Sequence, residues 1–257
     1  MITIKSEIQI EKMRRAGILL HQVLDALREE IHPGMTTHRL DKMAEKLIRD
    51  AGAIPSFKGY NGFPSSICAS VDDQVVHGFA NSEKLRQGQL LSVDCGVILD
   101  GWQSDSAFSV LVGGGSKEAQ QLVDVTERCF WLGAQQAVAG NHLGDIGHAI
   151  QTYAESFGYG VIRDLCGHGI GTEMHEDPNV PNYGRAGRGV KLEAGMTIAV
   201  EPMISMGTWK VYQEDDGWTV VTRDGSLCSH YEHTLLITDG EPEILSYPGM
   251  RVSEVLK

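Results

Sequence analysis

The sequence predicts an α+β fold built from two similar halves. Two helix-break-helix patterns occur along the chain, and each is followed by an apolar, strand-like run that ends in an acidic residue. Gly34 and Gly140, which break the two patterns, lie 106 residues apart. We therefore interpret the chain as one domain over residues 1–257 with an internal duplication, whose halves cover about 1–112 and 113–257.

The helical pair of the first half begins after Ser6, where the residues are typical of a capping box. Apolar residues then recur at helical spacing until residues 32–34, His-Pro-Gly, break the pattern. Thr36 or Thr37 is expected to cap a second helix. That helix should end at Gly52, since glycine favours the left-handed conformation of a helix stop.

The second half repeats this arrangement after Ser116. A helical run leads to a break at Gly140-Asn141, and a shorter helix extends to Gly158, which again lies 106 residues after its counterpart Gly52. Gly113-Gly114-Gly115-Ser116 is long enough only for a tight connection between the halves. This favours one domain over two independent ones.

Three acidic residues lie in runs that otherwise have the pattern of buried strands. Asp94 follows Leu-Leu-Ser-Val, Glu201 follows Thr-Ile-Ala-Val, and Glu232 precedes His-Thr-Leu-Leu-Ile. A carboxylate in such a strand loses much of its solvation free energy unless it is protonated, ion-paired or bound to a metal. Basic residues are scarce in the same runs, which favours a metal.

A predicted hairpin places a fourth acid, Asp105, beside Asp94. Asp100-Gly101 is typical of a two-residue turn, and the resulting register puts Asp94 opposite Ala107 and Asp105 opposite Gly96. The two aspartates are then diagonal neighbours on one face, about 7–8 Å apart at Cα. Their carboxylates could share one or two cations.

One neutral nitrogen ligand is expected near these acids. Residues 166–171, Cys-Gly-His-Gly-Ile-Gly, put His168 in a glycine-rich turn from which its imidazole can point into a cavity. Aspartates, glutamates and one histidine suit Mn²⁺, Fe²⁺, Co²⁺ or Zn²⁺, often as a pair. Any one of these residues alone could be a surface acid or a loop histidine, but five with this placement favour a metal site.

Charge and composition exclude several classes of function. Lys and Arg number 22 against 34 Asp and Glu, which gives a net charge of −12, and the chain has no basic block. A nucleic-acid substrate is therefore not expected. The N-terminus lacks a signal-peptide pattern and charges interrupt every long apolar stretch, so we expect a cytoplasmic protein with no membrane partner. Five dispersed cysteines without a C-x-x-C pair argue against disulfides and structural zinc.

Seven short motifs occur in an order and spacing typical of one enzyme family. They are Val76-His77-Gly78, Ser92-Val93-Asp94, Ser104-Asp105, Gly167-His168-Gly169-Ile170-Gly171, His175-Glu176-Asp177-Pro178, Ala199-Val200-Glu201-Pro202 and Tyr231-Glu232-His233-Thr234. Over nearly the whole chain they resemble the type I methionine aminopeptidases, bacterial-type members of the M24 family without an N-terminal extension. The resemblance implies the pita-bread (creatinase/aminopeptidase) fold, in which pseudo-two-fold αα-β halves surround a curved antiparallel sheet.

The resemblance also implies ligands for two divalent metal ions, whose identity among Co, Mn, Fe, Zn and Ni the sequence does not determine. Asp94 would bind one ion, Asp105 and Glu232 would bridge the pair, and His168 and Glu201 would bind the other. The pair would activate a water for attack on the scissile carbonyl, with Glu201 as the general base.

The same resemblance implies further residues at the substrate. His175 would stabilise the oxyanion of the tetrahedral intermediate, and His77 would contact the scissile amide. An apolar slot for a methionine side chain would be lined by Tyr60, Phe63, Cys68 and Trp218.

Four positions depart from the family pattern. They are Phe57, Asn61 where a His is common, Met174 where a Phe is common, and His230 where a Gln is common. Strand alternation puts His230 on the same face as Glu232. We expect these changes to alter the shape of the slot, and with it the preference for the second residue, and to leave the metal site untouched.

The predicted function is metal-dependent removal of the N-terminal methionine from nascent proteins and peptides whose second residue is small. Its partners would be these polypeptides and the ribosome, and nothing in the sequence requires more than a monomer.

Three alternatives are less favoured. X-Pro aminopeptidases and prolidases usually carry an extra N-terminal domain and an Arg soon after the second Asp, where this chain has Ser106-Ala107-Phe108-Ser109. Type II methionine aminopeptidases carry a helical insertion between the positions of Glu201 and Glu232, which only 30 residues separate here. A metal-free binding module with the same fold ranks low because all five ligand positions are filled.

Overall fold

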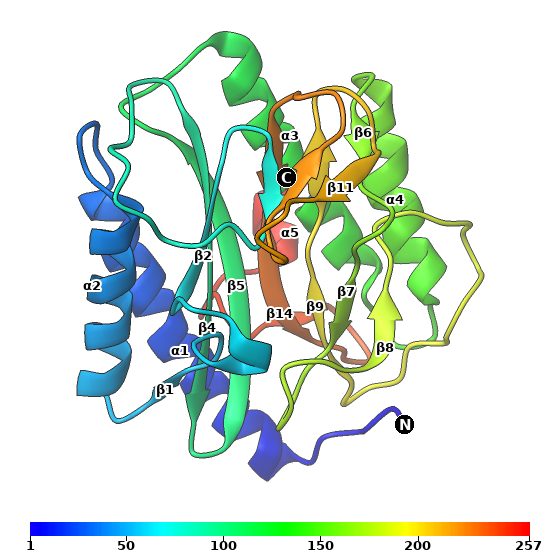
Figure 1. Cartoon of the computed structure of the whole chain (residues 1–257). Helices are drawn as coiled ribbons and strands as arrows, with labels where there is room; N and C mark the ends of the chain where they lie inside the picture. The colour runs from blue at the N-terminus through cyan, green and yellow to red at the C-terminus, as the bar shows by residue number, and fades with distance from the viewer.

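A nine-stranded antiparallel sheet lies at the centre of the computed structural model, which describes residues 1–257 (Figure 1). Its strands are β1 (Ile54–Pro55), β2 (Ile67–Val71), β4 (Leu90–Leu99), β5 (Trp102–Leu111), β7 (Gly167–Gly169), β8 (Glu176–Val180), β9 (Thr197–Val200), β14 (Glu232–Leu236) and β15 (Glu243–Ile244). The main order is β1-β4-β5-β14-β9-β7-β8, with β2 paired to β4 and β15 paired to β14. Strands from the two halves of the chain therefore meet where β5 pairs with β14.

Two small sheets and four long helices complete the fold. The first small sheet has the order β13 (Cys228–His230), β10 (Met203–Ser205), β6 (Gly160–Val161), and the second has the order β11 (Val211–Gln213), β12 (Val220–Thr222), β3 (Gln74–Val76). The long helices are α1 (Glu7–Glu30), α2 (Thr37–Asp50), α3 (Lys117–Gln136) and α4 (Leu143–Ser156), and two short helices are η1 (Tyr60–Gly62) and α5 (Val252–Val255). None of them is long and apolar enough to span a membrane.

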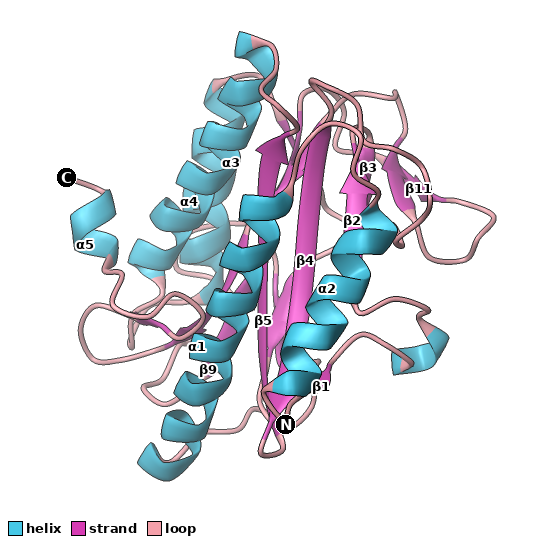
Figure 2. Ribbon diagram, turned by 90° about the vertical axis from the view of Figure 1, so that its left-hand side faces the viewer, coloured by secondary structure: helices cyan, strands magenta, loops and turns pink.

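The long helices begin where the sequence predicts them. The Ser6 N–H donates to Gln9 Oε1 at 2.8 Å in a capping box, the Thr36 hydroxyl accepts from Arg39 N–H, and the Ser116 hydroxyl accepts from the first turn of α3. Figure 2 shows α1 and α2 packed over one face of the long strands β4 and β5, with α3 and α4 alongside. Loops and the small strands β3 and β11 lie on the other side of the long strands (Figure 2).

The glycines that end the helical patterns adopt equivalent conformations in the two halves. The φ angles are 89° at Gly34 and 97° at Gly140, and 77° at Gly52 and 78° at Gly158. Only glycine occupies this left-handed region without a steric cost. The equivalence is consistent with an internal duplication, and the division at about residue 112 stays a prediction.

The hairpin between β4 and β5 has the predicted register. Asp100 and Gly101 form the two-residue turn with φ angles of 51° and 80°, as a twisted hairpin requires. Asp94 pairs with Ala107, and Asp105 pairs with Gly96. The two aspartates are therefore diagonal neighbours, as the turn chemistry alone predicts.

The expected glycine-rich turn around His168 is wrong, because residues 167–169 form strand β7. Its glycines are needed for close packing between strands. A Cβ at Gly167 would lie 2.3 Å from the Ala199 carbonyl oxygen, and one at Gly169 would lie 2.1 Å from that of Asp177. Short glycine-flanked strands have no periodicity that would separate them from a turn in the sequence.

Substitution of Gly17 by Ala is expected to lower the free energy of unfolding by about 1–3 kcal/mol. Gly17 lies in α1, where alanine normally stabilises a helix by about 1 kcal/mol relative to glycine. Here a Cβ would lie 2.0 Å from the backbone oxygen of Leu245. Urea denaturation tests the sign of the effect.

Gly133→Ala in α3 is the matched control, because the nearest atoms to its Cβ are side-chain carbons of Ile150 at 2.9 Å and Ile146 at 3.3 Å rather than backbone atoms. This control should lower the free energy of unfolding by less than Gly17→Ala does. Stabilisation by Gly17→Ala would contradict the close approach of α1 to Leu245.

Candidate metal centre

The structure brings the five predicted ligand residues to one cavity of about 260 Å³. They come from five segments of the sheet. Asp94 lies in β4, Asp105 in β5 and His168 in β7, while Glu201 directly follows β9 and Glu232 begins β14. Strand pairing, rather than proximity in the sequence, therefore assembles the cluster.

Hydroxyl groups fix the backbone of this cluster. The Thr234 hydroxyl accepts from the Asp105 N–H at 3.0 Å and donates to the Asp105 carbonyl at 2.9 Å. The Ser106 hydroxyl donates to the Glu232 carbonyl at 2.7 Å. These bonds join β5 to β14 and hold the two carboxylates in place between the halves of the sheet.

Several carboxylate oxygens in the cluster are buried without a hydrogen-bond partner. They are Asp94 Oδ1, Asp105 Oδ1 and Glu232 Oε1. No Lys or Arg is among the residues that line the cavity, so no protein cation balances these acids. Buried anions without a counter-charge are costly, which makes a bound cation the natural partner.

Burial raises the pKa of each of the four acids. The pKa of Asp105 rises to about 7. The pKa values of Asp94, Glu201 and Glu232 lie well above the ordinary range because of burial and, second, the charge of Asp105. Divalent cations would reverse this effect by stabilising the charged forms.

His168 is oriented as a nitrogen ligand. Its Nδ1–H donates to the Gly169 carbonyl at 2.9 Å, which leaves the lone pair on Nε2. Nε2 lies 3.7 Å from Glu201 Oε1 and 3.9 Å from Asp105 Oδ2. Burial, together with the nearby His175, lowers the pKa of His168 to about 4, so the imidazole is neutral at pH 7.

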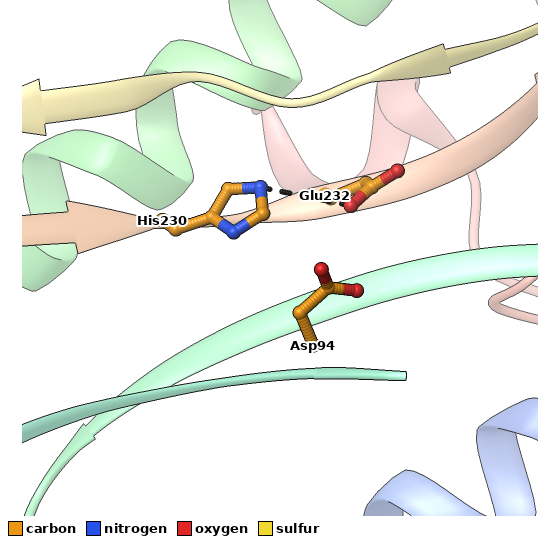
Figure 3. Close-up of side chains that lie close together, drawn as sticks. All are labelled: Asp94, His230 and Glu232. Atoms are coloured by element: carbon orange, nitrogen blue, oxygen red, sulfur yellow. Dashed lines mark ion pairs between the residues drawn. The ribbon is translucent and has the colours of Figure 1, made fainter. Parts of the chain in front are cut away.

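A second imidazole, that of His230, lies in the same cluster. Asp94, His230 and Glu232 offer ligand atoms within 4.8 Å of one another, as do Asp105, His168 and Glu232. Figure 3 shows the His230 ring directed towards Glu232 and Asp94. His230 therefore lies among the predicted ligand residues, and the expectation that position 230 leaves the metal site untouched stays a prediction. The prediction from strand alternation that His230 lies on the same face as Glu232 agrees with this position.

The remaining predicted residues line the same cavity as the acids. They are His77, His175, Tyr60, Phe63, Cys68 and Trp218. Phe57, Asn61 and Met174, at three of the four departures, line it too. Cavity wall and carboxylate cluster thus form one continuous site.

The two histidines beside the cluster are held in different ways. The Tyr60 hydroxyl and His175 Nδ1 are hydrogen-bonded at 2.9 Å, and the rings of His175 and His168 lie 4.4 Å apart. His77 has a φ of 61°, a conformation that is rare outside glycine and clusters at functional sites. Burial lowers the pKa of both His77 and His175, so both are neutral at pH 7.

The apolar wall consists of packed aromatic and sulfur-containing side chains. Phe63 and Trp218 meet edge to face with ring centroids 5.1 Å apart. Phe57, Cys68 and Met174 belong to the same buried cluster. Burial raises the pKa of the Cys68 thiol well above its usual range, so Cys68 contributes an apolar surface and no thiolate.

A buried cluster of acids and imidazoles that opens onto a cavity is typical of metal-dependent hydrolases. The unpartnered oxygens, the neutral imidazoles and the absence of Lys and Arg from the cavity lining all fit divalent cations. Residues 11–239 match the model of metallopeptidase family M24, and the chain belongs to this family. Family membership indicates divalent metal binding, for which the cluster supplies the donors.

Two similar proteins are methionine aminopeptidases. The sequence is 53% identical over 247 residues to the methionine aminopeptidase of Clostridium acetobutylicum, an alignment that covers 96% of this chain and 99% of that protein. The crystal structure of methionine aminopeptidase from Rickettsia prowazekii superposes with a TM-score of 0.94 at 41% identity, over 96% of this chain and 100% of that one. These matches confirm the predicted family and its α+β pita-bread fold.

A more distant structural neighbour shares the fold alone. The prolidase from Pyrococcus furiosus is 20% identical, with a TM-score of 0.74, and the alignment covers 96% of this chain but 66% of that one. The prolidase alternative is therefore not favoured.

Proposed function

We propose that this protein is a metal-dependent aminopeptidase that removes the N-terminal methionine from polypeptides whose second residue is small. One observation carries the proposal: the carboxylate cluster and the apolar wall of Tyr60, Phe63, Cys68 and Trp218 line a single cavity. A peptide whose first side chain fills the apolar part would place its first amide bond beside the carboxylates. The similarity to methionine aminopeptidases supports methionine as that first residue.

The proposed metal ligands follow from the donors present. Asp94 would bind one ion, Asp105 and Glu232 would bridge, and His168 and Glu201 would bind the other. Two divalent cations, drawn from Mn, Fe, Co, Zn or Ni, would lower the pKa of a water and polarise the scissile carbonyl. Four carboxylates facing one another without a protein counter-charge support two cations rather than one.

The remaining chemistry is assigned to three side chains. Glu201 would take the proton of the attacking water, because the bound cations would keep its buried carboxylate ionised. His175, held by the Tyr60 hydroxyl, would donate to the oxyanion. His77 would contact the scissile amide. All three line the same cavity.

The proposed setting follows from the substrate. Newly made polypeptides carry an N-terminal methionine, so nascent chains near the ribosome are the proposed physiological substrates. We further propose that the enzyme acts in the cytoplasm as a monomer, with residues 1–257 as one catalytic domain.

Hydrolysis of two tripeptides by the metal-loaded protein tests this function. We expect release of methionine from Met-Ala-Ser, no cleavage of Ala-Pro-Ala, and loss of activity when a chelator removes the metal. Cleavage of Ala-Pro-Ala alone would assign the protein to X-Pro hydrolysis. Cleavage of neither peptide with any of the five metals would favour a binding module.

A further inference from the structure

His230 is anchored as firmly as the predicted ligands. It ends β13, where Ser109 of β5 fixes its backbone: the Ser109 hydroxyl accepts from His230 N–H at 3.1 Å and donates to the His230 carbonyl at 2.8 Å. The side chain is 2% exposed. Ser109 lies on the same strand as Asp105, so the imidazole has a fixed position relative to the carboxylates.

The contact of His230 Nε2 with Glu232 has the spacing of two ligands of one metal ion. Nε2 lies 3.6 Å from Glu232 Oε2 and 3.7 Å from Glu201 Oε2, and it has no hydrogen-bond partner. Both distances are too long for a hydrogen bond. Two ligands each about 2.1 Å from one ion lie about 3.0–3.6 Å apart for bond angles between about 90° and 120°. The 3.6 Å between His230 Nε2 and Glu232 Oε2 fits two ligands of one ion, whereas Glu201, at 3.7 Å, is proposed for the other ion.

The two imidazoles occupy equivalent places on either side of Glu201. His168 Nε2 lies 3.7 Å from Glu201 Oε1, and His230 Nε2 lies 3.7 Å from Glu201 Oε2. The two groups of convergent donors, Asp105-His168-Glu232 and Asp94-His230-Glu232, each contain one histidine and share Glu232. Each group could thus hold one cation, with one nitrogen ligand apiece.

We propose that His230 is a sixth protein ligand, whose Nε2 binds the cation held by Asp94, so that each ion of the pair has one imidazole. This proposal rests on the proposed function, since it assumes the two-cation centre. An ion bound by Asp94 and carboxylates alone would have only oxygen donors. The added imidazole shifts that position towards Fe, Co, Ni or Zn and tightens binding there.

Proton NMR of the Co²⁺-loaded protein tests the proposal by counting ligated histidines. A histidine that binds Co²⁺ through Nε2 keeps an exchangeable Nδ1–H, whose resonance the paramagnetic ion shifts far outside the normal range and which disappears in D₂O. We expect two such resonances in the saturated wild-type protein. One resonance would overturn the proposal while leaving a metal centre intact, and none would contradict the proposed metal centre itself.

Three substitutions assign the resonances. His230→Gln and His168→Gln should each remove a different resonance, whereas His148→Gln, at an exposed position on α4, should remove neither. Calorimetric titration of His230→Gln should show one of two Co²⁺ equivalents weakened by at least about 10-fold. Unchanged affinity at both sites, with both resonances present, would assign His230 to packing. The number of shifted resonances in the wild-type protein tests whether His230 binds metal even if a variant fails to fold.

Discussion

Replacement of Glu201 by Gln is expected to lower kcat for Met-Ala-Ser about 10²–10⁴-fold, the range that a general base contributes. Glutamine keeps the shape of the side chain but removes both the proton acceptor and one anionic oxygen. Each carboxylate oxygen of Glu201 lies 3.7 Å from an imidazole nitrogen, so the substitution also weakens the centre that both imidazoles share. Steady-state kinetics at saturating metal measures the effect on kcat separately from that on KM.

Glu193→Gln is the matched control, because Glu193 is exposed and does not line the cavity. It should leave kcat unchanged. The apolar wall is intact in Glu201→Gln, so KM for the peptide should change little. A change in KM with wild-type kcat would contradict a role for Glu201 in the chemical step.

Substitution of Asp105 by Asn is expected to have opposite effects on stability with and without metal. In the metal-free protein, burial raises the pKa of Asp105 to about 7, whereas an unfolded aspartate titrates near 4. The folded state therefore holds a proton that the unfolded state releases between about pH 4 and pH 7, so stability is lost as the pH rises through this window. Asparagine does not ionise, so the variant avoids this loss of stability. Without metal at pH 8, the variant should therefore be more stable than the wild type.

The metal-loaded proteins should rank in the reverse order. The cation stabilises the ionised Asp105, so Mn²⁺ should raise the unfolding temperature of the wild type more than that of the variant. Thermal unfolding at pH 5 and pH 8, with chelator or with Mn²⁺, gives the four comparisons. The control Asp124→Asn, at an exposed position, should not reverse its stability relative to the wild type when metal is added. A variant that is less stable than wild type under all four conditions would contradict an uncompensated charge at this position.

Local chemistry explains why so much of the fold could be predicted from the sequence. Asp100-Gly101 determines a two-residue turn, and that turn alone sets the register that makes Asp94 and Asp105 diagonal neighbours. Glycines in the left-handed conformation, such as Gly34 and Gly140, mark the ends of the helical patterns. Each of these features is determined by a residue and its immediate neighbours in the chain, without contacts to distant segments.

The parts that could not be predicted depend on contacts between distant segments. The glycines around His168 resemble a turn in the sequence, but they are required by the backbones of Ala199 and Asp177, which pack against them. Alternation placed His230 on the face of Glu232, but its distance to Glu201 depends on how β13 lies against β5, where Ser109 binds the His230 backbone. Sequence periodicity gives the face of a strand and not the separation between strands.

Anomalous diffraction from crystals grown with Mn²⁺ tests most directly whether this cluster holds cations. We predict two anomalous peaks inside the cavity, one between Asp105, His168 and Glu232 and one between Asp94, His230 and Glu232. No peak within ligand distance of these carboxylates at saturating Mn²⁺ would contradict the assignment of the buried acids to a metal centre.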